Sequence, residues 1–417
     1  MQFKRVVVTG LGAITPLGND VTSYWNNLCN GVSGAAPITR FDASKFKTRF
    51  ACEVKNFNVE DFLDRKEARK VDPFCHYGIV ASMQAVADAG ITKENANPDR
   101  VGVIWGSGIG GLKTFQDEVL AFGKGDGTPR FNPFFIPKMI ADICSGHISI
   151  MFGFRGPNYT TVSACASSTN ALIDALNTIR LGKADIIVAG GSEAAVNESG
   201  IGGFNAMHAL STRNDSPATA SRPFDLERDG FVLGEGGCCI IVEELEHALK
   251  RGAKIYAELC GGGLTADANH ITAPHPEGLG ALNVMRLSLE DAGLKTSDID
   301  YINVHGTSTP LGDVAETKAI LGVFGADAYK LNISSTKSMT GHLLGAAGAI
   351  EATACILAIK HDLVPPTINH FTDDPALDPK LNFTFHKAQK RVVRAALSNT
   401  FGFGGHNASV IFKKYTA

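Results

Sequence analysis

Cys165 stands in a segment whose composition suits a reactive thiol. It lies in the run TVSACASSTN, residues 161–170, where small polar residues lead directly into a helical pattern. A cysteine at a helix N-terminus meets the positive end of the helix dipole and unpaired backbone N–H groups, and both favour thiolate over thiol. The segment therefore predicts a nucleophile. The alternative is one more buried structural cysteine, since the chain has nine.

Two histidines stand where an active site could use them. His305, in the run INVHGTSTP, ends an apolar strand pattern, and open α/β sheets place active residues at that end. His342 begins a helical pattern of small apolar residues and needs hydrogen-bond partners there, for which Lys337 and Glu351 are candidates. A structural histidine at 305 and a helix cap at 342 are the alternatives.

A glycine-rich segment, NTFGFGGHN at residues 399–407, follows a strand pattern. Its glycines expose backbone N–H groups that could form half of an oxyanion hole. Its phenylalanines could line an apolar channel. A plain β-turn is the alternative.

Short β-branched runs alternate with longer helical patterns, which predicts an α/β fold whose sheets are covered by helices. Strands are predicted at Arg5–Thr9, Val101–Trp105, Ile186–Ala189, Cys239–Val242, Asp300–Val304, Ala395–Ser398 and Ser409–Phe412. Helices are predicted at Val21–Cys29, Cys75–Ala89, Thr169–Leu181, Gly280–Ala292, Asp313–Phe324 and Ala346–Lys360.

The strand–turn–helix unit around Cys165 recurs around His342, which suggests that one unit is used twice. We expect a boundary near residues 249–256. It divides the chain into an N-terminal half, 1–252, with the cysteine, and a C-terminal half, 253–417, with both histidines.

Composition limits the partners. The 417 residues carry 39 basic and 42 acidic side chains, a net charge of −3, so nothing favours a nucleic-acid partner. The start MQFKRVVVTGLG suits a strand rather than a signal peptide, and no run approaches the ~18 apolar residues of a membrane span. We expect a cytoplasmic protein that does not enter the membrane.

Several patterns suggest other chemistry only weakly. The cysteines are widely spaced without CxxC, which disfavours disulfides and zinc. Glycine pairs at Gly10-Leu-Gly12 and Gly106–Gly111 are reminiscent of dinucleotide-binding turns but lack a clear acidic residue ~20 positions on, so glycine turns at strand ends are favoured. His270 and His275 lie in a proline-rich loop without partnering carboxylates, which favours surface histidines over a metal pair.

Taken together, these segments resemble the β-ketoacyl-acyl carrier protein synthases of the thiolase-like condensing enzymes, with chain-elongating members the most similar. The resemblance covers nearly the whole chain, from VVVTGLGAITPLG through SRPFD–ERDGFVLGEG (221–236), HGTSTPLGD and SSTKSMTGHLLGAAGAIE to FGFGGHNASVIF. It implies a five-layer αβαβα fold of two βαβαβαββ halves in a homodimer, with no cofactor and no metal.

The resemblance also implies roles for particular residues. Cys165 corresponds to the nucleophile that accepts an acyl chain from acyl carrier protein, and His305 and His342 to the histidines that hold the malonyl thioester. Backbone N–H groups of Cys165 and Phe403 correspond to the oxyanion hole, and Phe403 to the gate. Lys337 corresponds to an ordering lysine, with supporting residues Thr307, Thr309, Glu351 and Phe401.

The remaining implied residues concern the acyl chain and its carrier. Ile109 corresponds to a pocket-floor residue, and Phe134 or Phe135 is expected to reach the pocket across the dimer interface. A basic rim is expected to receive the acidic carrier protein, at Lys66, Arg69, Lys70 and Arg130. The sequence departs from the family in His406, where threonine is usual, and in Phe131 and His208, which replace basic residues of some relatives.

The reaction expected from the resemblance is thioester exchange onto Cys165 followed by decarboxylative condensation with a malonyl thioester. Three alternatives stay open. They are a ketosynthase of a polyketide or aryl-polyene pathway, a non-catalytic chain-length partner, and an NAD(P)-dependent oxidoreductase suggested by the glycine patterns.

Overall fold

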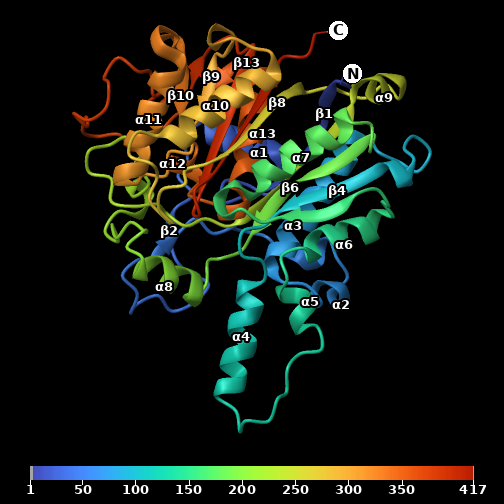
Figure 1. Cartoon of the computed structure of the whole chain (residues 1–417). Coiled ribbons are helices and arrows are strands. Elements are labelled where there is room, and N and C mark those ends of the chain that lie inside the picture. Colours follow the sequence, from blue (N-terminus) through green and yellow to red (C-terminus); the bar gives the residue numbers. More distant parts are fainter. Residues whose placement is uncertain (1–2, 417) are drawn as a thin grey trace.

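The computed structural model describes residues 3–416 and centres on a ten-stranded mixed sheet (Figure 1). Its strands follow the order β10-β9-β13-β14-β8-β1-β7-β6-β4-β5. Two further pairs are short, β2 (Ala36–Pro37) with β3 (Phe50–Ala51) and β11 (Leu363–Val364) with β12 (Gln389–Lys390). The α/β fold expected from strand–helix alternation is confirmed.

The large sheet consists of two five-stranded halves with the same topology. The first half contains β1 (Val6–Ile14), β7 (Gly236–Glu244), β6 (Ile186–Glu193), β4 (Val101–Gly106) and β5 (Asn158–Thr161). The second contains β8 (Ala257–Ala266), β14 (His406–Lys413), β13 (Ala395–Gly402), β9 (Tyr301–Asn303) and β10 (Asn332–Ser334). In each half two antiparallel pairings are followed by two parallel ones. The halves join where β1 pairs antiparallel with β8, and this is the predicted duplication.

Helices complete five layers. α3 (Pro73–Ala89) and α6 (Ile143–Phe152) cover the outside of the first half-sheet, and α10 (Leu279–Ala292), with α11 (Pro310–Phe324) against it, covers the second. α7 (Ser167–Arg180) and α13 (Ala347–His361) lie between the half-sheets and contact strands of both. The other helices are α1 (Val21–Cys29), α2 (Arg65–Ala68), α4 (Leu112–Gly123), α5 (Phe135–Met139), α8 (Glu198–Ala206), α9 (Leu245–Lys250) and α12 (Lys337–Thr340).

The two central helices begin in the same way. Each follows a short 3₁₀ turn, Ala164–Ala166 before α7 and Leu344–Ala346 before α13. The first residue of each turn is left-handed, with φ of 50° at Ala164 and 49° at Leu344, a conformation that costs free energy in a non-glycine residue. The repeated unit therefore brings the Cys165 turn and the turn after His342 to the same place in the two halves.

Small residues let α7 and α13 approach closely. A Cβ added at Gly348 would lie 2.0 Å from Thr169 Oγ1.

The segment Leu344–His361 is long and apolar enough to cross a membrane by length and composition, which the sequence analysis did not expect. However, 89% of that segment is buried inside the molecule. Buried between two sheets, this segment has the surroundings of a core helix.

One glycine prediction is wrong. Gly10-Leu-Gly12 is not a turn at a strand end, because β1 continues through it to Ile14. A Cβ at Gly10 would lie 2.3 Å from Ala85 O, and one at Gly12 would lie 2.0 Å from Ala81 O. These glycines therefore let β1 run against the backbone of α3, a close approach that no other residue allows.

An arm formed by α4, the following loop and α5 projects from the body (Figure 1). Large apolar side chains on it are exposed to solvent, including Phe122, Phe131, Phe134 and Ile136. An apolar surface on a projecting element indicates a place where another molecule packs.

Candidate active site

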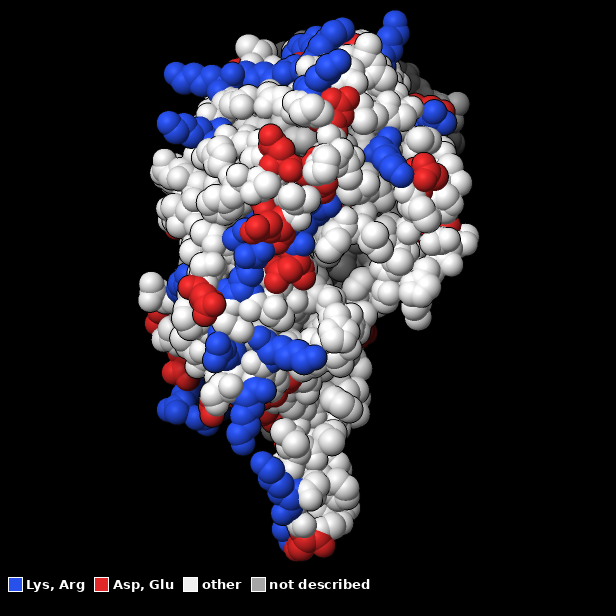
Figure 2. All heavy atoms as spheres, turned by 90° about the vertical axis from the view of Figure 1, so that its left-hand side faces the viewer, with Lys and Arg blue, Asp and Glu red and all other residues white. Residues whose placement is uncertain are grey.

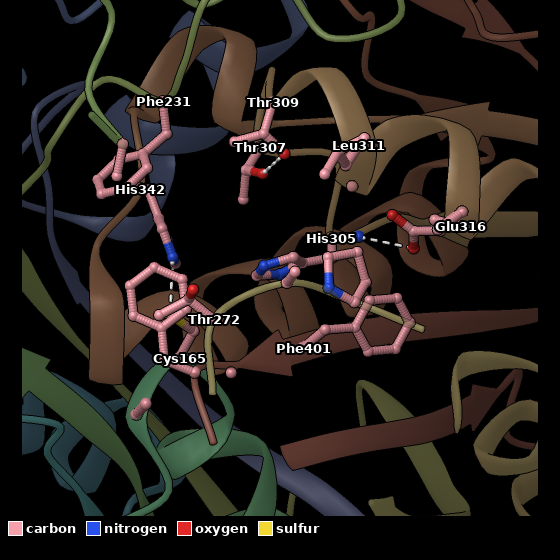
Figure 3. A pocket seen from close by; sticks show the side chains of 18 of the residues that line it. Cys165, Phe231, Thr272, His305, Thr307, Thr309, Leu311, Glu316, His342 and Phe401 are labelled. Carbon is pink, nitrogen blue, oxygen red and sulfur yellow. Dashed lines mark hydrogen bonds between the residues drawn. The ribbon is translucent and has the colours of Figure 1, made fainter. Parts of the chain in front are cut away.

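A cavity of about 600 Å³ reaches the turn that carries Cys165. Its walls come from both halves of the chain, with Cys165 from one and His305 and His342 from the other, as the repeat predicts. Figure 3 shows the thiol and the two imidazoles facing the same space. The lining also includes Ile109, Thr307, Thr309, Phe401 and Phe403.

Cys165 lies in the 3₁₀ turn just before α7 and is 7% exposed. Its Sγ is 2.9 Å from His342 Nε2. Burial raises the pKa of the thiol to about 12, while the Lys337 charge and a backbone hydrogen bond from Phe403 act in the opposite direction. The predicted shift towards thiolate is therefore wrong in direction, because the helix end adjoins a desolvated turn. The geometry instead supplies a proton acceptor, His342, at hydrogen-bond distance.

His305 follows β9, at the carboxyl end of a parallel strand. Glu316 of α11 holds its backbone, accepting hydrogen bonds from the N–H groups of His305 and Gly306, each 2.9 Å long. Burial lowers the pKa of His305 well below its usual value, and the charge of Lys337 lowers it further. The ring is therefore neutral near pH 7. Its centroid lies 5.4 Å from that of His342.

His342 follows α12 and is 3% exposed. The ring of Phe231 packs edge-on against it, with the ring centroids 5.3 Å apart. Burial, followed by the charge of Lys337, lowers the pKa of His342 well below its usual value. The Nδ1 atoms of both His305 and His342 lack a hydrogen-bond partner within residues 3–416.

Lys337 and Glu351 form an ion pair in which each side chain is 1% exposed. The sequence analysis proposed both as partners of His342, but the structure pairs them with each other. Burial raises the pKa of Glu351 to about 7, and the adjacent ammonium opposes that rise. Beside burial, which is the larger cause, the Lys337 ammonium lowers the pKa of both imidazoles further.

The glycine-rich turn closes over Cys165. A Cβ added at Gly402 would lie 2.7 Å from Ser163 O and 3.1 Å from Cys165 N, so β13 must end in glycine here. The next residue, Phe403, lines the cavity and gives a backbone hydrogen bond to the thiol. Phe401 lies against His305, with ring centroids 5.5 Å apart.

The turn after His305 is stabilised by hydrogen bonds from other parts of the chain. Thr307 and Thr309 line the cavity, and their hydroxyls are 3.1 Å apart. Ser308 between them is left-handed, with φ of 69°. Its N–H donates to Asp313, its O accepts from Gly230 N–H, and its hydroxyl accepts from the N–H of Arg222. The SRPFD–ERDGF segment noticed in the sequence therefore supports this turn.

Ile109 is 41% exposed and lines the cavity at the glycine turn after β4. Sequence reasoning did not find Glu193, the last residue of β6, whose buried carboxylate accepts hydrogen bonds from this turn. It also missed Glu316. The available signal was an acidic residue at the end of an apolar strand, IIVAGGSE, where only a buried partner explains the charge.

Other predicted residues lie outside the cavity. Phe134 and Phe135 are on the arm and do not line the cavity of this chain. Lys66 and Arg69 are exposed on and just after α2, while Lys70 pairs with Glu67 and Arg130 with Asp126. Figure 2 shows the left-hand side of Figure 1, away from α2, and Lys and Arg side chains gather on the lower part of that face as well, with acidic side chains at the tip of the arm.

The three departures from the family pattern lie in different places. The ring of His406 lies against Gly404, where an added Cβ would be 2.8 Å from Nε2. His208 is exposed and lines the cavity, whereas Phe131 stacks on Phe122 and Phe135 of the arm. His270 and His275 belong to no metal-binding group, since residues 3–416 contain no cluster of three or more His, Cys, Asp or Glu side chains that could hold a metal ion.

The duplicated five-layer fold, with one cysteine and two histidines around a single cavity, defines the class of thiolase-like condensing enzymes. Residues 3–248 match the β-ketoacyl synthase N-terminal domain, and residues 256–371 match the β-ketoacyl synthase C-terminal domain. The chain therefore belongs to the β-ketoacyl synthase family, and it is an acyltransferase.

Known proteins resemble it along the whole chain. It is 52% identical over 416 residues to a 3-oxoacyl-[acyl-carrier-protein] synthase 2 of a Synechocystis species, covering 100% of this chain and 99% of that one. A structure of the ishigamide ketosynthase/chain length factor superposes with a TM-score of 0.92 at 36% identity, covering 99% and 100%. A type II polyketide ketosynthase in complex with its acyl-carrier protein gives 0.90 at 33%, covering 100% of both chains.

Proposed function

We propose that this chain is a 3-oxoacyl-acyl carrier protein synthase that performs the elongation step of type II fatty acid biosynthesis. It joins an acyl chain carried by acyl carrier protein to a two-carbon unit from malonyl carrier protein. The products are 3-oxoacyl carrier protein, carbon dioxide and free carrier protein. The observation that carries the proposal is a thiol within 2.9 Å of one neutral imidazole, with a second neutral imidazole facing the same cavity.

In the first step Cys165 Sγ attacks the thioester carbonyl of the acyl carrier protein. His342 Nε2 accepts the thiol proton, which is needed because burial raises the pKa of the thiol. Backbone N–H groups of Cys165 and Phe403 stabilise the negative oxygen. The carbon–sulfur bond to the carrier then breaks, the carrier sulfur takes the proton, and the acyl chain remains on Cys165.

In the second step the malonyl thioester loses carbon dioxide. The electron pair of the broken carbon–carbon bond moves to the thioester oxygen as an enolate. The N–H group of His305 donates a hydrogen bond to that oxygen, and His342 does the same from Nε2 after its ring proton has moved there from Nδ1 through solvent, because Nε2 was the proton acceptor in the first step. The enolate carbon attacks the acyl carbonyl, and the bond to Cys165 breaks. The Cys165 sulfur then takes a proton from solvent, because the overall reaction consumes one proton. No redox change occurs, and Lys337 and Glu351 act by position and charge.

The wall of the cavity divides between the two substrates. Ile109 lies on the acyl side, with Phe134 or Phe135 supplied by a second copy of the chain. Thr307 and Thr309 provide hydroxyls on the path of the malonyl carrier arm, beside Phe401. Full-length identity of 52% to a 3-oxoacyl-[acyl-carrier-protein] synthase 2 favours this pathway over the polyketide alternative, since identity to the type II polyketide ketosynthase is 33%.

The carrier protein docks through charge. Lys66 and Arg69 are exposed beside α2, with Lys70 and Arg130 as further cations. A related ketosynthase has been solved in complex with its acyl-carrier protein, which supports a carrier protein as the partner. An acidic partner meeting these cations gains association rate and orientation more than affinity.

The chain acts as a cytoplasmic homodimer. β5 is the last strand of the sheet, and its outer edge is open, whereas at the opposite edge Ile333 of β10 is bonded to Asn382. Tyr159 of β5 and Ile150 of α6 are 40% and 79% exposed. An open edge strand with apolar neighbours favours pairing with a second copy. The division of each chain at residues 252 and 253 is supported by the repeated order of strands.

The proposal is tested by measuring the intact mass of the protein after mixing it with medium-chain acyl carrier protein and then with malonyl carrier protein. We expect one acyl adduct, absent in Cys165→Ala, that disappears as 3-oxoacyl carrier protein and carbon dioxide form. No adduct across several chain lengths would overturn the proposal and favour a non-catalytic or specialised role.

A further inference from the structure

Glu193 is a fully buried carboxylate that the proposed mechanism does not use. It ends β6 and accepts hydrogen bonds from five groups. They are the N–H groups of Gly108, Ile109, Gly110 and Gly345, at 2.7, 3.2, 3.2 and 3.0 Å, and the Ser107 hydroxyl, at 3.3 Å. All of these donors are neutral.

The donors come from two turns that are distant in the sequence. Three amides and the hydroxyl belong to the turn of Ile109, on the acyl side of the cavity, and the fourth amide belongs to the turn after His342. The turns touch each other, because a Cβ at Gly345 would lie 2.3 Å from Gly108 N. A Cβ at Gly108 would also lie 3.4 Å from Ala164 O, next to the nucleophile.

A buried carboxylate without a cation is expensive to keep, and simple packing does not require it. Burial raises the pKa of Glu193 to about 7, and the backbone hydrogen bonds oppose that rise. The hydrogen-bond donors of the two turns converge on one place, and a carboxylate supplies two acceptor oxygens there. Oε1 serves Ser107, Ile109 and Gly110, while Oε2 serves Gly108 and Gly345.

We propose that Glu193 is a positioning residue that fixes the Ile109 turn to the turn after His342, so that selection of the acyl chain and condensation with malonyl depend on one carboxylate. The inference rests on the proposed function for its malonyl part. The part that concerns the shape of the acyl pocket depends only on Cys165 and Ile109.

Glu193→Gln tests this because an amide cannot replace the carboxylate in either orientation. Its NH₂ group would face either the amides of Gly108 and Gly345 or those of Ile109 and Gly110. We expect at least one turn to move. The preference of the enzyme for acyl chain length should shift, and condensation should slow by about tenfold or more relative to acylation of Cys165.

Glu316→Gln is the matched control. That carboxylate also accepts two backbone N–H groups, but from His305 and Gly306, and it does not touch the Ile109 turn. We expect slower condensation with the chain-length profile of the wild type. An unchanged chain-length profile in Glu193→Gln would overturn the inference.

Two further measurements keep the outcomes separate. Alkyl methanethiosulfonates of increasing length label Cys165 when its sulfur attacks the alkylthio sulfur, forming a mixed disulfide and releasing methanesulfinate, so they report the pocket without any carrier protein. A wild type that is labelled by the thiosulfonates but takes no acyl chain from acyl carrier protein would contradict the proposed function. A shifted labelling profile in Glu193→Gln would still support the role of Glu193. If Glu193→Gln does not fold, Ser107→Ala removes one donor, and an unchanged labelling profile in that variant overturns the inference.

Discussion

At the scale of single residues, burial decides the acid–base behaviour of the site. The thiol of Cys165 is raised to a pKa of about 12, and both histidines are held neutral, because the turns that carry them are removed from water. The sequence shows a cysteine before a helix and predicts a nucleophile there. The sequence does not show how far the Cys165 turn is shielded from water. That burial raises the pKa of the thiol, where the helix end alone would lower it.

Alkylation of Cys165 by iodoacetamide should therefore keep increasing with pH between about pH 7 and 9, since the thiolate fraction grows as long as the pH lies below the pKa. His342→Ala should slow the reaction by removing the proton acceptor. The rate is measured by intact mass, with Cys165→Ala giving the background from other cysteines. A rate that levels off near pH 7 would instead support the helix-end effect.

His342 should make the fold sensitive to acid. Its pKa is depressed in the folded state, so below about pH 6.5 the unfolded chain binds a proton that the folded chain does not. This contribution to stability is present above that pH and decreases as the pH falls, by at most about 1.4 kcal/mol per pH unit.

His342→Gln, which cannot titrate, should remove that contribution. The free energy of unfolding, measured with urea at pH 7.5 and 5.5, should decrease less between the two values in the variant than in the wild type. Carboxyl groups that titrate in the same range are common to both proteins and cancel. Equal decreases would show that His342 is protonated in the folded state.

At the scale of elements, turns that lie at the ends of strands carry the chemistry and are held by residues from elsewhere in the chain. Arg228, for example, stabilises the turn that carries Thr307 and Thr309. Its guanidinium donates to Thr309 O, Pro310 O and Asp225 O and pairs with Asp374 at 2.6 Å. A strained Ser308 persists because so many bonds hold its turn.

Arg228→Lys should loosen that turn, because one ammonium cannot replace a planar fork with several donors. We expect kcat/KM for malonyl carrier protein to fall about tenfold, while acylation of Cys165 changes little. Arg213→Lys is the control, since Arg213 donates to Glu227 O and not to this turn. Equal losses in both half-reactions would assign Arg228 to general stability.

At the scale of the whole molecule, the two halves have the same strand order but different edges. β10 is covered and β5 is open, and the arm of α4 and α5 exists only in the first half. The duplication thus leaves one unpaired edge, which suits association of two copies about that edge.

Ile150→Glu should shift the protein from dimer towards monomer, because it places a charge on an apolar surface beside the open edge. Light scattering after size exclusion measures the mass, and acylation by long chains should weaken in parallel if Phe134 or Phe135 comes from the partner. Val392→Glu, at an apolar position that is also exposed, at 64%, should remain dimeric. A monomeric wild type would contradict this arrangement.

Lys66→Glu should raise the KM for acyl carrier protein several-fold and leave the KM for a small acyl thioester unchanged, because it reverses a charge at the docking surface only. The difference should shrink with added salt. Lys183→Glu serves as the control. Lys183 lies shortly before the first residue of β6, at the end of the strand away from Glu193. Equal effects on carrier-bound and small substrates would place docking elsewhere.

The sequence by itself determined the α/β fold class of the protein and the family that it resembles. The Cys165, His305 and His342 motifs, the alternation of strands and helices, and the repeated unit were all visible because each depends on neighbouring residues. Tertiary structure decided what lies between distant positions. Glu193 holds amides 85 and 152 positions away, Lys337 pairs with Glu351 instead of His342, and Gly10 and Gly12 continue a strand against α3. The physical reason is that burial and converging hydrogen bonds arise only when separate segments meet, and no local pattern records the distance between them.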